Sequence, residues 1–152
     1  MSGYTIRSAV NADAAELARL SSQLGYPASE ATIRARLTRI VDSPVDCLLV
    51  AASSDEKLDG WIQGSLCQLL ESDYRVEIGG LLVDEGSRRK GVGAELVCRL
   101  EEWALSQGAV EVSVRCREER VEAHHFYESL RFKRIKRQQV FRKRLGSDEV
   151  EV

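Results

Sequence analysis

The stretch Leu81-Leu82-Val83-Asp84-Glu85-Gly86-Ser87-Arg88-Arg89-Lys90-Gly91-Val92-Gly93-Ala94 decides how this chain is interpreted. It begins as an apolar strand, passes through a basic turn that contains glycines, and leads into an amphipathic helix. The first amide groups of a helix lack intrahelical partners, and the helix dipole favours an anion beside them. Gly91 and Gly93 let a ligand approach the main chain closely because neither carries a Cβ atom. The stretch therefore predicts a binding turn for a phosphate-bearing ligand.

The composition is that of a globular domain with 43% hydrophobic and 30% charged residues among 152. We expect one domain over residues 1–145 and an acidic, disordered tail over residues 146–152. The net charge of −2 argues against a nucleic-acid partner. No apolar run is long enough for a membrane span, and residues 1–4 lack the core of a signal peptide. We therefore expect a cytoplasmic protein with no membrane partner.

The four cysteines stand apart, at positions 47, 67, 98 and 116, and none forms a Cys-x-x-Cys pair. Zinc sites usually need more closely spaced ligands, and disulfide scaffolds are denser in cysteine. We expect four buried free thiols and no metal.

Hydrophobic periodicity predicts an α/β fold with one mixed, mostly antiparallel sheet. Helices are expected after Asn11, after the capping residue Ser29, after Gly93 and over residues 118–130. Strands are expected over residues 5–9, 47–52, 58–70, 74–83, 110–116, 132–135 and 138–144. The prediction is about seven strands flanked by about four helices.

Two familiar phosphate-binding devices fit the basic turn poorly. In a P-loop, lysine and a hydroxyl residue follow the second glycine, but Val92 and Gly93 stand there. A dinucleotide-binding turn needs a third glycine and an acidic residue that ends the next strand. The next strand here ends in Arg115-Cys116-Arg117, whose charge has the wrong sign for a ribose hydroxyl.

A third pattern fits better. Arg88-x-x-Gly91-x-Gly93-Ala94, placed between a strand and a helix, resembles the acetyl-CoA signature of the GNAT family of N-acetyltransferases. A second block, Arg120-x-x-Ala123-x-x-Phe126-Tyr127-x-x-x-Arg131-Phe132, is similar to the family's downstream motif. Both blocks occur in the family's order, and the resemblance covers roughly residues 4–145.

The resemblance implies that the main chain of the turn wraps the pyrophosphate of acetyl-CoA, while the side chains of the basic run either screen phosphate charge or remain solvated. The main chain of residues 81–83 would pair with the pantetheine amides, and one N–H there would face the thioester oxygen. The residues assigned to acetyl-CoA are Leu81, Leu82, Val83, Arg88, Arg89, Lys90, Gly91, Val92, Gly93, Ala94 and Arg120.

The resemblance also implies the catalytic residues. Tyr127 would be the general acid for the departing thiolate, or else a core aromatic residue beside Phe126. Glu77 would be the base for the amine, acting through a water, or else a surface partner of a basic side chain. Glu71 and Asp73 would line the amine site, and together with Glu77 they weakly favour a cationic acceptor.

Two residues depart from the family's pattern. Arg120 stands where asparagine is commoner, and Arg131 replaces the glycine before Phe132. That glycine usually turns the chain with a positive φ, so Arg131 implies local strain or an altered turn.

The resemblance thus implies direct acetyl transfer from acetyl-CoA to a primary amine of a small molecule or peptide. The alternatives are a non-catalytic acyl-CoA-binding or regulatory module with the same fold and an unrelated nucleotide-binding protein. Relatives commonly dimerise, so a homodimer is expected.

Overall fold

The computed structural model describes residues 3–54 and 56–146. The chain forms two compact units, Met1–Arg117 and Glu118–Val152, which are described separately.

The first unit is built on a single five-stranded sheet in the order β1-β2-β3-β4-β5. Its strands are β1 (Thr5–Ser8), β2 (Asp46–Ser54), β3 (Lys57–Cys67), β4 (Arg75–Val83) and β5 (Glu111–Val114). Neighbouring strands from β1 to β4 are antiparallel, whereas β5 runs parallel to β4. The mixed, mostly antiparallel sheet is confirmed, although about seven strands were expected.

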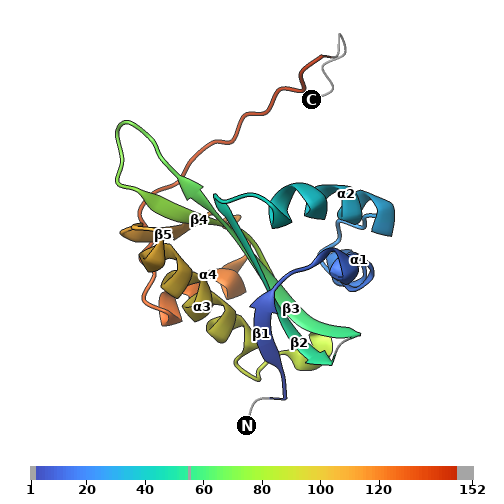
Figure 1. Cartoon of the computed structure of the whole chain (residues 1–152). Helices are drawn as coiled ribbons and strands as arrows, with labels where there is room; N and C mark the ends of the chain where they lie inside the picture. Colours follow the sequence, from blue (N-terminus) through green and yellow to red (C-terminus); the bar gives the residue numbers. More distant parts are fainter. Residues whose placement is uncertain (1–2, 55, 147–152) are drawn as a thin grey trace. The chain divides into compact units, whose positions relative to one another are not determined.

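Helices cover both faces of this sheet (Figure 1). The face with the first helices carries η1 (Asn11–Asp13), α1 (Ala14–Ser22) and α2 (Glu30–Val41), and the opposite face carries α3 (Val92–Ser106) after η2 (Glu85–Ser87). Ser29 caps α2 as expected, because its hydroxyl accepts a hydrogen bond from the Thr32 N–H at 3.1 Å.

The core lies on both faces of the sheet. One cluster, under α1 and α2, consists of Ala9, Ala14, Leu17, Leu20, Leu37, Val50, Leu58 and Leu82. On the other face, the helical period of α3 buries Val92, Leu96, Leu100 and Ala104. A Cβ atom on Gly64 would lie 2.8 Å from both Leu100 and Val76, so α3 packs closely on β3 and β4.

The four cysteines are free thiols, as expected, but they are not all buried. Cys47 is buried, and its burial raises the pKa of the thiol to about 11. Cys98 is exposed because it lies on α3 outside the apolar stripe. The expectation that it is buried is wrong.

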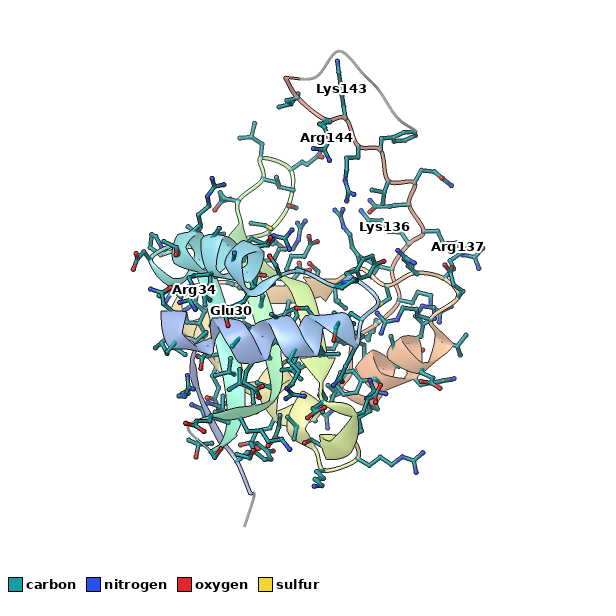
Figure 2. All side chains as sticks on the ribbon, turned by 90° about the vertical axis from the view of Figure 1, so that its right-hand side faces the viewer. Glu30, Arg34, Lys136, Arg137, Lys143 and Arg144 are labelled. Atoms are coloured by element: carbon teal, nitrogen blue, oxygen red, sulfur yellow. The ribbon has the colours of Figure 1, made fainter. Side chains whose placement is uncertain are left out.

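The second unit contains α4 (Val121–Ser129), followed by an extended segment (Figure 1). The closing strands predicted over residues 132–135 and 138–144 are wrong, since residues 132–146 contain no strand. Alternating apolar residues form a strand only where another strand pairs with them, and Ile135 and Phe141 are instead 80% and 91% exposed. Figure 2 shows Lys136, Arg137, Lys143 and Arg144 along this segment. From residue 147 on, the predicted acidic tail lies outside the described residues.

No helix within residues 3–54 and 56–146 combines the length and the apolar character that crossing a membrane requires.

Candidate functional site

Strand β4 is paired on both sides over its first half only. Residues 75–78 pair with β5, which ends at Val114, whereas residues 80–83 pair only with β3 among the described strands. Gly79 is the extra residue of a β-bulge between the pairs Gly64–Ile78 and Gln63–Gly80. The edge of β4 from residue 79 to residue 83 is therefore open, and its main chain can pair with an extended ligand.

Glycines shape the start of this open edge. A Cβ atom on Gly80 would lie 2.6 Å from the Trp61 ring, so the indole occupies the space directly over the Gly80 main chain. Trp61 packs against the core cluster under α1 and α2, and its buried Nε1 has no acceptor among the described residues. The ring is therefore held by packing and closes one side of the strand at this point.

The residues expected to carry the pantetheine lie on the open edge. The Leu82 side chain is only 5% exposed and belongs to the core, while Leu81 and Val83 are half-buried. Their side chains are structural, so any ligand contact here is made by main-chain groups, as expected from the sequence.

The basic turn follows directly from this strand and ends at α3. Arg89 and Gly91 have φ values of 68° and 80°, both in the left-handed region. Left-handed residues at such spacing turn successive N–H groups towards one point and form an anion-binding concavity. Gly91 is the N-cap of α3 and has no side chain that could accept a hydrogen bond from the first N–H groups of α3. Main-chain donors at residues 89–94 are thus available to a phosphate.

The basic side chains of the turn are exposed. Arg88, Arg89 and Lys90 all lie at the surface, and Arg88 donates only a long hydrogen bond, 3.4 Å, to the Val83 carbonyl. They add positive charge around the turn.

A buried hydrogen bond fixes the turn to β3. The Ser87 hydroxyl donates to the Asp59 carboxylate at 3.0 Å, and both side chains are buried. The Asp84 N–H donates to the Asp59 carbonyl at 2.7 Å. Asp59 therefore holds both ends of η2 and sets the path of the turn.

A second network fixes the turn to α1. The Gln23 amide donates to Asp84 Oδ1 at 2.8 Å and accepts from the Glu85 N–H at 3.2 Å, while Arg19 lies 3.4 Å from Asp84 Oδ2. Hydrogen bonding from Gln23 outweighs the effect of burial and, with the Arg19 charge, lowers the pKa of Asp84. The C-terminal end of α1 and the start of the turn are thereby joined.

The predicted base, Glu77, lies on β4 two residues before the bulge. Its side chain is 28% exposed and forms an ion pair with Arg115, with Nε and Oε1 3.4 Å apart. Glu77 is level with Ser65 of β3 and Ser113 of β5 in the sheet register. Glu71 and Asp73 lie apart from it, in the exposed connection between β3 and β4.

The other predicted site residues, Arg120 and Tyr127, belong to the second unit. Arg120 is the N-cap of α4. The Tyr127 ring makes edge-to-face contacts with Phe126 and Phe132, with centroids 5.0 Å and 5.3 Å apart. Arg131 has a φ of 72°, which confirms that it occupies the left-handed conformation for which glycine is better suited.

The residues whose hydrogen bonds hold the turn in place were not predicted from the sequence; these are Asp59, Ser87, Asp84 and Gln23. Arg115 as the partner of Glu77 and Trp61 as the side chain over Gly80 were not predicted either. Asp84 carried a signal, because an acidic residue ends the strand just before the turn; the others had none that is local in sequence.

No cluster of three or more histidine, cysteine or acidic side chains in the described ranges is arranged to hold a metal ion.

Comparisons with known proteins agree with this geometry. The model of the acetyltransferase (GNAT) family matches residues 13–132. A search among curated protein sequences finds no significant match.

Solved structures share the fold. A transcriptional regulator from Bacillus halodurans C-125 has a TM-score of 0.83 and 22% identity, covering 92% of this chain and 99% of its own. An aminoglycoside antibiotic 6'-N-acetyltransferase from Acinetobacter baumannii has a TM-score of 0.82 and 18% identity, with coverage of 94% and 99%. A structure of AAC(6')-Iy with the bisubstrate analogue CoA-S-monomethyl-acetylneamine has a TM-score of 0.82 and 20% identity, with coverage of 94% and 99%.

Proposed function

The chain belongs to the acetyltransferase (GNAT) family, and we propose that it transfers acetyl to a primary amine by direct attack within a ternary complex. Like its family, it is an acetyl-CoA-dependent acetyltransferase, with acetyl-CoA as co-substrate. The observation that carries the proposal is the continuous run from the open edge of β4 into the left-handed turn and the uncapped start of α3.

The main chain of this run suits the two ends of acetyl-CoA. Residues 81–83 offer the main-chain groups of their open edge to the pantetheine amides, while the amides of residues 89–94 meet the pyrophosphate. An N–H of the open edge also stabilises the negative charge that develops on the thioester oxygen. Arg88 and Arg120 add charge for the phosphates.

Acid–base chemistry falls to Glu77 and Tyr127. Glu77 accepts the proton of the attacking amine through a water, and Arg115 holds its carboxylate in place. As the new carbon–nitrogen bond forms and the carbon–sulfur bond breaks, Tyr127 donates its phenolic proton to the departing thiolate. Holding both reactants on one strand supplies most of the rate enhancement.

The experiment that tests this function measures free-thiol release from acetyl-CoA with a panel of amines. Thiol release that depends on both the amine and the protein supports the proposal. Binding of acetyl-CoA without thiol release on any amine would favour a non-catalytic acyl-CoA-binding module. Thermal stabilisation by ATP or NAD and none by CoA would point instead to a nucleotide-binding protein.

Variants test the assigned roles. Tyr127→Phe should lower kcat by about 10²-fold with little change in KM, because it removes a single proton donor. Tyr4→Phe is the matched control, because it also removes one phenolic hydroxyl, which binds Glu95 on α3 and has no role in the proposed chemistry. An unchanged rate in Tyr127→Phe would remove this residue from the mechanism.

The homodimer and the cytoplasmic location stay predictions. Sedimentation equilibrium tests whether the protein is a homodimer.

A further inference from the structure

Arg75, on β4, is a half-buried cation whose hydrogen-bond partners are neutral. Its Nε donates to the Ser113 hydroxyl at 3.2 Å and its NH1 donates to the Ser72 hydroxyl at 3.0 Å. Within the described ranges, no carboxylate forms an ion pair with it. Half-buried charges in proteins are usually paired with an opposite charge, and a guanidinium matches a carboxylate with two parallel hydrogen bonds. The arginine is thus oriented by hydroxyl groups while its charge is left for another partner.

Arg115, on the neighbouring strand, supplies a second guanidinium to the same side of the sheet. Its Nε lies 3.4 Å from Oε1 of Glu77, and its side chain is 63% exposed. A guanidinium has five N–H donors, so most of its hydrogen-bonding capacity remains for other groups. Glu111 of β5 is in register with Arg75, but among the described residues the two side chains form no ion pair. Asp46 of β2 is two strands away and is hydrogen-bonded by the Ser65 hydroxyl.

The order of these residues along β4 sets the direction in which an acceptor extends. The open edge begins at Gly79, Glu77 comes two residues before it, and Arg75 two residues before Glu77. Alternate residues of a strand face the same side at a spacing of about 6.6 Å. Arg75 lies on the side of Glu77 away from the open edge, whereas Arg115 follows Val114, which is level with Ile78, and so lies on the side of the open edge. An amine beside Glu77 is therefore flanked by two guanidinium groups and has the acetyl donor at the open edge.

We propose that the acceptor is an amine that also carries a carboxylate, which Arg75 and Arg115 bind while Glu77 receives the amine. The inference rests on the proposed function and names its substrate class. It differs from the cationic acceptor that Glu71, Asp73 and Glu77 weakly favoured, because Glu71 and Asp73 lie in the exposed hairpin and Glu77 is already paired with Arg115. A polycationic amine would bring further positive charge towards these two arginines.

The test compares acceptors that share an amine. Thiol release is measured with α-, β- and γ-amino acids, with the carboxamide of each, and with the amine lacking the carboxyl group; spermidine and an aminoglycoside complete the panel. We expect kcat/KM for the best amino acid to exceed that for its carboxamide by about 10- to 100-fold, mainly through KM, as befits a charge-assisted hydrogen bond. Carboxamides or polycations that match or exceed the amino acids would overturn the proposal, while thiol release itself would leave the acetyltransferase function standing.

Variants locate the preference. Arg75→Gln and Arg115→Gln should each reduce the ratio of kcat/KM for the amino acid over its carboxamide by about 10-fold. Arg99→Gln is the matched control, because Arg99 is an exposed, ion-paired arginine on α3, on the opposite face of the sheet. If Arg75→Gln does not fold, the exposed Arg115 carries the test alone. A ratio that stays constant in the folded variants would refute the assignment.

A binding measurement separates the two proposals if no amine is acetylated. Calorimetry with CoA and an N-acetylated amino acid, compared with its carboxamide, reports carboxylate recognition without turnover. Preferential binding of the carboxylate that is lost in Arg115→Gln would support the site although the transfer reaction had failed. Equal binding, or none, would refute it.

Discussion

Replacing Gln23 by alanine tests whether α1 holds the phosphate-binding turn in place. The side chain joins the two elements through hydrogen bonds to Asp84 Oδ1 at 2.8 Å and from the Glu85 N–H at 3.2 Å. The substitution removes both bonds and leaves the Asp84 carboxylate, which is 7% exposed, with Arg19 as its remaining side-chain partner at 3.4 Å. The turn should then be less stable and less well positioned.

The loss of stability expected for Gln23→Ala follows from the burial of the Asp84 carboxylate and the exposure of the Glu85 amide. A hydrogen bond to a charged group contributes about 1.5–3 kcal/mol, and the loss falls on the buried carboxylate because water can reach the exposed Glu85 amide. Partial compensation by Arg19 places the expected loss near 2 kcal/mol. For a chain of this length, that corresponds to a decrease in Tm of about 4–8 °C. KM for acetyl-CoA should rise more than KM for the amine, since the turn is the proposed contact of the pyrophosphate.

Thermal unfolding between pH 3 and pH 8 checks the electrostatic part. The pKa of Asp84 is lowered in the folded protein, so its stabilising effect is present above the unfolded pKa of about 3.9 and is lost as pH falls through the folded value. The difference in Tm between the wild type and Gln23→Ala should therefore be large at pH 7 and shrink below about pH 4. Gln107→Ala, at an exposed glutamine, is the control. Equal Tm values at pH 7, or a difference that grows with acid, would refute this account.

Three further substitutions test local features. Gly80→Ala should lower the free energy of unfolding by about 1–3 kcal/mol in urea titrations, since its Cβ would lie 2.6 Å from the Trp61 ring. Ser29→Ala should lower the free energy of unfolding by about 1 kcal/mol, because the Thr32 N–H loses the hydroxyl that caps it. The helical circular dichroism signal should accordingly be lost at a lower urea concentration. Arg131→Gly should raise the free energy of unfolding by about 0.5–1 kcal/mol, and Tm slightly with it, because glycine adopts a φ of 72° without strain.

Features that depend on neighbouring residues were predictable. The stripe of α3, the cap at Ser29 and the left-handed conformation of Arg131 each follow from side-chain chemistry within one or two turns of chain. The turn after β4 was equally accessible, because its glycine and its place between a strand and a helix are visible in the sequence. These local signals were enough to identify the fold class and to propose the main-chain binding run.

Features that depend on contacts between residues far apart in the sequence could not be predicted. The segment over residues 132–144 has strand-like alternation, but alternation does not say whether another strand pairs with it. The same limit applies to Glu77 and Arg115, which meet because β5 runs parallel to β4 in one register, and to Gln23 and Asp84, which are 61 residues apart. The sign of the charge around the proposed base therefore emerged only once the register was known.

A binding site made of main-chain groups constrains the residues that support its backbone more than the residues that contact the ligand. Any residue except proline supplies a main-chain N–H, so the ligand contacts that we propose at residues 81–83 and 89–94 restrict side chains little. What must be kept is the path of the chain, which the Ser87–Asp59 bond fixes to β3 and Gln23 fixes to α1. Since α1 also covers the face of the sheet on which Glu77 lies, a loosened Gln23 contact should disturb both the acetyl donor and the surface that receives the amine. Substitutions in these supporting residues should therefore affect activity more than substitutions of the exposed arginines of the turn.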